Sequence, residues 1–239
     1  MTTLLIATRN AHKVGEIRAI LGGKYQLQTL DDVSDAPSVV EDAGTFAGNA
    51  AKKAVVLARW LETKHSTFNI QHSTSNFVLA DDSGLEVDAL NGAPGVHSAR
   101  FAAMDSGRPG NSSDADNNAK LLRLLKHVPP EKRAARFHCV LALVAVPAGT
   151  IELAPDIPER RESSSPVCYL DEFEPRTFDG VCEGRMIHEL RGNNGFGYDP
   201  LFVPDGYERT FAELGDDVKN KISHRARALA QLKNYFANS

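Results

Sequence analysis

The stretch FVLADDSGLEVDAL, residues 77–90, is where the fold of this chain is expected to be decided. Its first four residues are apolar and are typical of a short buried strand. Asp81 and Asp82 follow that strand directly, and the Ser-Gly pair at 83–84 predicts a turn. Apolar and acidic residues then alternate over 85–89, which predicts a second strand with one solvated face.

Asp81 and Asp82 have two interpretations. At the end of a buried strand, a pair of carboxylates is well placed to bind a metal ion or to act as a general base. Asp and Ser also bond to their own backbone in turns, and Gly accepts a positive φ, so the same residues could serve the turn alone. The stretch by itself does not decide between the two.

The composition is that of a globular protein, with 42% hydrophobic and 24% charged residues in a chain of 239. A net charge of −4 argues against a general nucleic-acid binder, which usually has a basic surplus. Any anion-binding site must therefore be a local cluster of basic residues. The length allows one large domain or two small ones, with a sizeable core.

Several features favour a cytoplasmic protein. Cys139, Cys168 and Cys182 have no metal-binding spacing and cannot all pair within one chain, which fits a reducing compartment. The opening MTTLLIATRN lacks the basic n-region of a signal peptide. The longest apolar run, 139–146, is far shorter than the ~20 residues needed to span a bilayer. We therefore expect neither a nucleic-acid partner nor a membrane partner.

A strand, a short loop and a helix are predicted at the start of the chain. The apolar strand at 4–7 is followed by Thr8-Arg9-Asn10 and by a helix that Asn10 caps and the Gly-Gly pair at 22–23 ends. Free N–H groups at such a helix start can bind an anion, and Arg9 and Lys13 lie on either side of them. On this stretch alone, a plain capped helix with a surface lysine is the favoured interpretation.

The rest of the chain alternates between strands and helices. Strands are predicted at 25–30, 136–146, 177–186 and 201–203, and helices at 45–61, from Asp114 to about 127, from Asp216 and from Ser223. The segment 64–76 is predicted to be a loop, and the Pro- and Ser-rich segment 147–175 a surface insertion. This alternation predicts an α/β fold with one mixed sheet.

Three further features are ambiguous by themselves. Glu41 and Asp42 precede a helix, and a favourable interaction with its dipole is preferred over metal binding. The glycine-rich loop at 191–200 matches neither the Walker pattern nor GxGxxG between a strand and a helix. His138 lies within a strand and is more typical of a core or sheet-face residue than of a ligand.

Six short motifs, taken together and in this order, resemble the inosine triphosphate pyrophosphatase family. They are ATRNAHK (7–13), EDAGTFAGNA (41–50), ADDSGLEVDALNGAPGVHSAR (80–100), ARFHC (135–139), GFGYDPLF (195–202) and KNKISHR (219–225). The resemblance implies a single domain over residues 1–239, built on one mixed β-sheet flanked by helices, with the active-site cleft between two lobes. It also implies a homodimer.

The resemblance further implies an activity. The family hydrolyses ITP, dITP and XTP to the monophosphate and pyrophosphate, uses Mg²⁺, and so removes these non-standard purine nucleotides from the pool. Carried onto this sequence, Glu41 and Asp82 would hold the metal ion, and Asp82 would also be the catalytic proton acceptor. This implication reverses the dipole interpretation of Glu41.

The remaining implied residues would bind the substrate. Those expected at the phosphates are Thr8, Arg9, Asn10, Ala11, His12 and Lys13, and those expected elsewhere on the nucleotide are Ser83, Phe196, Gly197, Tyr198, Asp199, Lys219, His224 and Arg225. His224 and Arg225 carry hydrogen-bond donors that suit the 6-oxo group of hypoxanthine or xanthine, and we expect them to select the base.

The sequence departs from the family pattern in places. Ala43 and Arg9 stand where the family usually has Gly, Gly48 stands where it often has an acid, and the insertion at 147–175 is longer than usual. Two other functions stay open: a regulatory module that binds nucleotides without turnover, and a serine hydrolase based on Ser83. The three carboxylates at 41, 81 and 82 favour the pyrophosphatase, and the missing GxSxG elbow disfavours the serine hydrolase.

Overall fold

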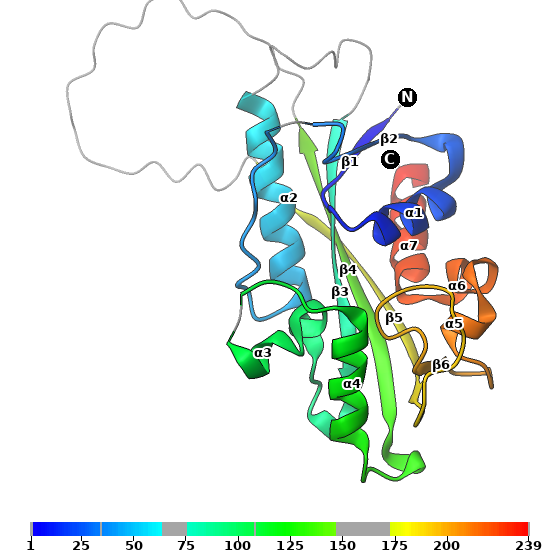
Figure 1. The fold of residues 1–239 in the computed structure, drawn as a ribbon. Coiled ribbons are helices and arrows are strands. Elements are labelled where there is room, and N and C mark those ends of the chain that lie inside the picture. The colour runs from blue at the N-terminus through cyan, green and yellow to red at the C-terminus, as the bar shows by residue number, and fades with distance from the viewer. Residues whose placement is uncertain (1, 34, 64–75, 108, 147–172, 239) are drawn as a thin grey trace, which may run out of the picture.

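Six strands form one mixed sheet in a computed structural model that describes residues 2–33, 35–63, 76–107, 109–146 and 173–238 (Figure 1). The strand order is β2-β1-β3-β4-β5-β6, with β1 parallel to both of its neighbours and the pairs from β3 to β6 antiparallel. The strands are β1 (Thr3–Ile6), β2 (Gln26–Thr29), β3 (Asn76–Val87), β4 (Ala134–Val146), β5 (Arg176–Met186) and β6 (Phe202–Pro204). The predicted α/β fold with a single mixed sheet is confirmed.

Helices cover both faces of the sheet. In Figure 1, α2 lies on one face, and α1 and α7 lie together on the other. The α-helices are α1 (Ala11–Leu21), α2 (Phe46–Thr63), α3 (Ala103–Ser106), α4 (Asp114–Leu125), α5 (Phe211–Leu214), α6 (Asp216–Ile222) and α7 (His224–Asn238). The 3-10 helices are η1 (Gly22–Lys24), η2 (Asp88–Leu90), η3 (Gly95–Arg100) and η4 (Pro130–Lys132). None of the helices in the described part of the chain is both long and apolar enough to cross a membrane.

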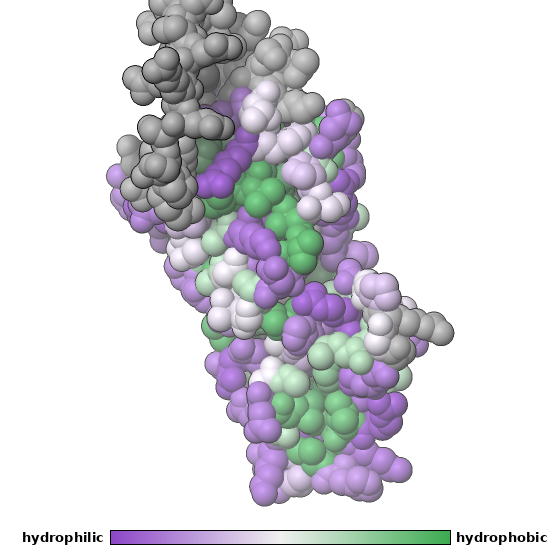
Figure 2. Space-filling view, turned by 90° about the vertical axis from the view of Figure 1, so that its left-hand side faces the viewer, coloured by the Kyte–Doolittle hydropathy of each residue, from purple (hydrophilic) through white to green (hydrophobic). Residues whose placement is uncertain are grey.

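The apolar core has three parts that divide the molecule into two lobes. Alternate residues of β1 and β3 pack against α2 on one face and against α1 and α7 on the other. A third cluster, around Phe101, Leu121 and Phe202, lies where the long strands extend beyond those helices and pack with α4 and α5. Figure 2 shows polar side chains across the middle of the α2 flank, between apolar areas above and below.

The predicted turn at 83–84 is wrong. β3 continues through it, and Gly84 pairs with His138 in an unbroken antiparallel ladder with β4. Gly84 serves close packing instead, because a Cβ atom there would lie 2.4 Å from the carbonyl oxygen of Gly95 and 2.4 Å from Oγ of Ser98. Since successive side chains of a strand point to opposite faces, Asp81 and Asp82 point to opposite faces of the sheet.

The other predicted elements are confirmed with small shifts of their ends. Asn10 caps α1 by accepting from the N–H groups of His12 and Lys13, and the helix ends at Gly22. α4 begins at Asp114 as predicted, but its cap is the preceding Ser113, whose hydroxyl accepts from the N–H of Asp116, whereas the sequence favours Asp114 itself as the cap. The predicted loop at 64–76 and the predicted insertion at 147–175 fall almost wholly outside the described residues.

Gly180 of β5 lies where α7 packs closely against the sheet. A Cβ atom at this position would lie 2.0 Å from the carbonyl oxygen of His224 and 2.5 Å from the N atom of Ala228. Gly180→Ala is therefore expected to lower the free energy of unfolding by about 3 kcal/mol, because α7 must shift off the sheet.

Gly15→Ala is the matched control, since nothing lies within 4 Å of its Cβ position in α1. Alanine is favoured over glycine in a helix by about 1 kcal/mol, so this variant should be slightly more stable than the parent. Urea denaturation of both variants gives the comparison. A Gly180→Ala protein as stable as the parent would contradict the close approach of α7 to β5.

Candidate active site

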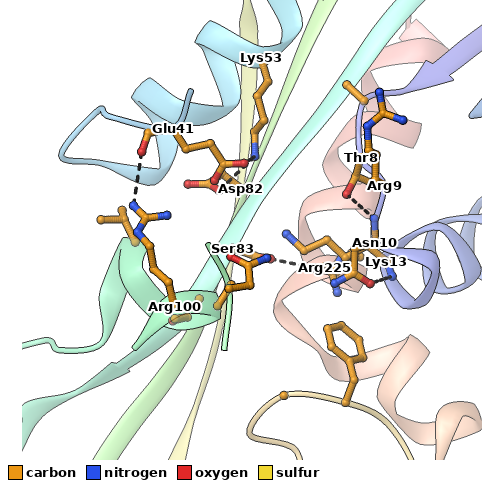
Figure 3. A pocket seen from close by; sticks show the side chains of 18 of the residues that line it. Thr8, Arg9, Asn10, Lys13, Glu41, Lys53, Asp82, Ser83, Arg100 and Arg225 are labelled. Atoms are coloured by element: carbon orange, nitrogen blue, oxygen red, sulfur yellow. Dashed lines mark hydrogen bonds and ion pairs between the residues drawn. The ribbon is translucent and has the colours of Figure 1, made fainter. Parts of the chain in front are cut away.

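A cavity of about 940 Å³ lies between the two lobes (Figure 3), and it is lined by the loop before α1, the middle of β3, the glycine-rich loop, Lys219 of α6 and the start of α7. Most of the residues predicted from the sequence line it: Thr8, Arg9, Asn10, Lys13, Glu41, Asp82, Ser83, Phe196, Gly197, Tyr198, Asp199, Lys219, His224 and Arg225. Ala11 and His12 are exposed at the start of α1 and are not among the described lining residues. The sheet and its two flanking lobes thus bring distant motifs to one place.

Lys53 of α2 joins two carboxylates at one side of the cavity. Its ammonium lies 3.1 Å from Oδ1 of Asp82 and 3.2 Å from Oε1 of Glu41, and it also donates to the carbonyl oxygen of Asp81 at 2.7 Å. Asn49, one helical turn earlier in α2, donates to Oδ2 of Asp82 at 3.1 Å. Arg100 of η3 approaches Glu41 from the other lobe and donates to its carbonyl oxygen at 3.3 Å.

Asp82 and Lys53 both have shifted pKa values. Burial raises the pKa of Asp82 above its ordinary value and nearby Glu41 adds to the effect, although Lys53 opposes it. Burial acts to lower the pKa of Lys53, but Asp82 and Glu41 outweigh it and hold the pKa above the ordinary value. Lys53 therefore stays charged, and Asp82 is a stronger base than an exposed aspartate.

Asp81 belongs to a second set of charges on the opposite face of β3. It accepts from Lys13 at 2.5 Å and from Nε of Arg225 at 2.8 Å, and Arg225 also pairs with Glu16 of α1. Glu16 lies 2.7 Å from Nζ of Lys219. Lys219 in turn lies 2.5 Å from Asp199, which completes a buried ion chain: Lys13, Asp81, Arg225, Glu16, Lys219 and Asp199.

The contacts of Arg225 and His224 do not suit the predicted role, in which their hydrogen-bond donors would select the base. The side chain of Arg225 is only 1% exposed, and its guanidinium donates to Asp81, Glu16 and Ser83, so its hydrogen bonds serve the ion chain. His224 is buried and stacks on Phe137, with the two ring centroids 4.9 Å apart. Burial holds its pKa well below the ordinary value, so the ring is neutral.

The loop before α1 is less open to anions than its sequence predicts. The N–H of Asn10 donates to Oγ1 of Thr8 at 3.2 Å, and the N–H groups of His12 and Lys13 donate to Oδ1 of Asn10. The helix cap thus uses groups that a phosphate would need. Arg9 donates to the carbonyl oxygen of Ala36 at 3.1 Å, and its side chain is the exposed cation of this loop.

The glycine-rich loop presents Phe196 at the cavity. The ring lies 4.5 Å from Nζ of Lys219 and stacks on His12, with ring centroids 5.0 Å apart. The backbone N–H of Phe196 donates to Oδ2 of Asp199 at 2.9 Å. The hydroxyl of Tyr198 donates to the carbonyl oxygen of Ser98 at 2.9 Å. The loop therefore supplies an aromatic surface, even though its pattern matched no phosphate-binding motif.

Sequence reasoning missed Lys53, Asn49 and Glu16. Each of these polar residues lies on the inward face of a helix, where the apolar pattern of α1 or α2 points to the core. A polar residue at a buried helical position is a signal, because burial without a partner is costly. Arg100 lay within the quoted 80–100 motif, but its residue type alone did not distinguish it from a surface arginine.

The donor set of Glu41 and Asp82 fits Mg²⁺. This ion takes one or two protein carboxylates together with water and substrate phosphates, and does not need a cage made of protein alone. The described residues contain no group of three or more His, Cys, Asp or Glu side chains that could hold a metal ion. Glu41 and Asp82, which Lys53 brings together at the cavity wall, supply two such carboxylates.

Comparison with protein families and characterised sequences gives a consistent result. The family model described as "Ham1 family" matches residues 4–235. A dITP/XTP pyrophosphatase of Opitutus terrae is 42% identical, over 99% of this chain and 99% of that protein. A dITP/XTP pyrophosphatase of Desulforamulus reducens is 44% identical, over 95% of this chain and 91% of that protein.

Solved structures of related proteins have the same fold. A HAM1 protein from Coxiella burnetii superimposes with a TM-score of 0.71 at 33% identity, with complete coverage of both chains at 100%. A nucleoside-triphosphatase / dITP/XTP pyrophosphatase from Mycobacterium abscessus gives a TM-score of 0.64 at 36% identity, covering 96% of this chain and 98% of that one.

Asp81→Asn tests the buried ion chain. The change leaves Arg225 and Lys13 without a carboxylate they share, and breaking a buried pair in this way costs about 3–5 kcal/mol of unfolding free energy. Burial acts to raise the pKa of Asp81, but Arg225 and Lys13 hold it well below its ordinary value. Its stabilisation is therefore present above the unfolded-state pKa of about 4 and is lost as the pH falls through the folded-state pKa.

Denaturation of Asp81→Asn and of the parent between pH 7 and pH 3 measures the loss of stability and its pH dependence. The difference in unfolding free energy between the two proteins should shrink toward pH 3. Asp42→Asn is the control, because Asp42 forms an exposed pair with Lys52 at 2.6 Å. Surface pairs contribute little, so this variant should unfold with the parent. Equal losses in the two variants would show that the ion chain does not stabilise the fold.

Proposed function

We propose, from the premise that this chain belongs to the Ham1 family, that it hydrolyses the non-standard purine nucleotides dITP, XTP and ITP to the monophosphate and pyrophosphate. The observation that carries the proposal is the arrangement of Asp82, Lys53 and Glu41 in a cavity that is also lined by an aromatic ring and several basic side chains. The related dITP/XTP pyrophosphatases support the choice of substrates.

Charge pairing indicates which cations are available to the phosphates. Lys13, Lys53, Lys219 and Arg225 line the cavity, but each already pairs with a carboxylate. Within the described residues, Arg9 donates to the carbonyl oxygen of Ala36 and Arg100 to that of Glu41, and neither pairs with a carboxylate there. A guanidinium suits phosphate oxygens, so these two arginines, one from each lobe, are proposed to bind the outer phosphates.

Asp82 is proposed to activate the attacking water. Its raised pKa makes it a better proton acceptor, and a carboxylate in reach of the reacting phosphate can orient a water molecule and take its proton. Lys53 holds Asp82 and Glu41 together against their repulsion. Mg²⁺, proposed to be held by Glu41 and Asp82, would neutralise charge on the phosphates when bound.

Phe196 and Lys219 are proposed to recognise the base. Phe196 offers a ring for stacking in the wall of the cavity, 4.5 Å from Nζ of Lys219. An ammonium has three donors, and Lys219 directs two of them to Asp199 and Glu16. The third suits a 6-oxo group, which hypoxanthine and xanthine carry and adenine lacks. Arg225 then contributes by holding Glu16 in place.

We also propose a homodimer in the cytoplasm. The family resemblance supports the dimer, and multi-angle light scattering tests it directly. Cys139 and Cys182 are both buried free thiols, which fits a reducing compartment.

The products of ITP hydrolysis distinguish this function from its alternatives. Phosphorus NMR should show inosine monophosphate and pyrophosphate in equal amounts, and the rate should fall to background when Mg²⁺ is removed with a chelator. Under the same conditions ATP should be a poor substrate, because adenine lacks the 6-oxo group that Lys219 is proposed to recognise. Release of orthophosphate with inosine diphosphate would refute the proposed cleavage between the α- and β-phosphates.

Asp82→Asn should lower kcat for ITP by at least ~10²-fold, because the amide cannot accept the proton. The raised pKa of Asp82 also predicts that the activity of the parent falls as the pH is lowered through a value above the ordinary ~4 of aspartate. A pH–rate profile with thermal unfolding measured in parallel separates this loss from unfolding. Activity of the variant within a few-fold of the parent would remove Asp82 from the chemistry.

A further inference from the structure

The backbone of Gly197 is held on both of its polar groups by side chains of α4. Its N–H donates to Oδ2 of Asp114 at 2.6 Å, and its C=O accepts from Nδ2 of Asn118 at 2.9 Å. Asp114 and Asn118 are four residues apart, so they lie on the same face of α4 one turn apart. The two bonds fix both peptide groups that flank the Cα atom of Gly197.

The loop around Gly197 needs such a restraint. Gly192, Gly195 and Gly197 all have positive φ angles, of 83°, 75° and 62°. Glycine moves freely between backbone conformations, so a loop with three of them has little stiffness of its own. The contacts that the loop makes with its surroundings must therefore set its conformation.

Phe196 is the residue that this restraint controls. It directly precedes Gly197, and its own N–H is bonded to Asp199 at 2.9 Å. The peptide between Phe196 and Gly197 carries one of the two bonds to α4, so a shift of the loop away from α4 would move the backbone that places the ring 4.5 Å from Nζ of Lys219. The direction of the ring in the cavity thus depends on α4, a helix that contributes neither Glu41 nor Asp82.

We propose that Asp114 and Asn118 are positioning residues that hold Phe196 ready for the nucleobase. The proposal rests on the proposed function, in which Phe196 stacks on the base. Preorganised groups bind a ligand more tightly because less ordering is required on binding. Loss of the restraint should weaken nucleotide binding and leave the hydrolytic chemistry at Asp82 nearly unchanged.

Asn117 provides a matched control on the same helix. Asn117 and Asn118 are equally buried, at 3% and 4% exposure. Asn117 also bonds to backbone on both sides of its amide, accepting from the N–H of Ala102 at 2.9 Å and donating to the C=O of Ala99 at 3.3 Å. Its bonds stay within the η3–α3 region, whereas that of Asn118 reaches the glycine-rich loop.

The first measurement compares steady-state kinetics and thermal unfolding of Asn118→Ala and Asn117→Ala. Both variants should lose similar stability. Asn118→Ala should raise KM for ITP by roughly fivefold to tenfold, the equivalent of one hydrogen bond, and change kcat less than twofold. Asn117→Ala calibrates the loss of stability alone, because its bonds to Ala99 and Ala102 lie beside Arg100 and its KM can change through the phosphates. A KM of Asn118→Ala equal to that of the parent would overturn the proposal.

A second measurement uses Phe196 itself. In a Phe196→Ala background the ring has gone, so adding Asn118→Ala should produce no further rise in KM. An additional rise of the same size as in the parent would mean that Asn118 acts through another part of the site, and the proposal would fail.

Hydrogen exchange measured by mass spectrometry tests the restraint without any substrate. Peptides covering residues 194–199 should exchange faster in Asn118→Ala and Asp114→Ala than in Asn117→Ala. Asp114→Asn keeps an oxygen that can accept from Gly197 and should restore slow exchange. Because this readout requires no hydrolysis, unchanged exchange would refute the positioning role, whereas an inactive parent enzyme would count against the proposed function alone.

Discussion

The pleat of β3 at residues 81 and 82 is the constraint on which the whole site depends. Because the strand does not turn there, its two adjacent carboxylates point to opposite faces of the sheet. Asp82 faces α2 and meets Lys53, whereas Asp81 faces α1 and α7 and meets Lys13 and Arg225. One face therefore carries the groups proposed to react, and the other carries charges that join the surrounding helices.

The ion chain through Asp81 solves a problem that burial creates. An isolated buried charge is too costly to keep, so each member of the chain needs a partner of opposite sign. Those partners come from different elements: Glu16 from α1, Lys219 from α6, Arg225 from α7 and Asp199 from the glycine-rich loop. Each of these pairs forms only when two separate elements have met, and the full chain only when all of them have, which ties the cavity walls to the cooperative fold.

Much of the fold could be predicted from sequence, and most of the site residues that the family resemblance implies do line the cavity, for identifiable reasons. Helix caps and glycine stops are local signals, and Asn10 and Gly22 act as predicted. The turn at 83–84 failed because pairing of β3 with β4 over the whole strand outweighs the local preference of Ser-Gly. Lys53 and Glu16 were not predicted because a charged side chain on a helix is usually solvated, and their position on the inward face gives only a weak signal that does not identify their partners.

The structure also separates two kinds of positive charge by their access to solvent. Ions in solution screen exposed charges within about 10 Å at 0.1 M salt, but they scarcely reach buried pairs. The guanidinium of Arg225 is sealed among carboxylates, while Arg9 is exposed at the cavity mouth. Rising ionic strength should therefore weaken the attraction of a polyanion to the cavity at salt concentrations that leave the fold intact. Substrate capture, and not folding, should then limit the activity of this protein at high salt concentration.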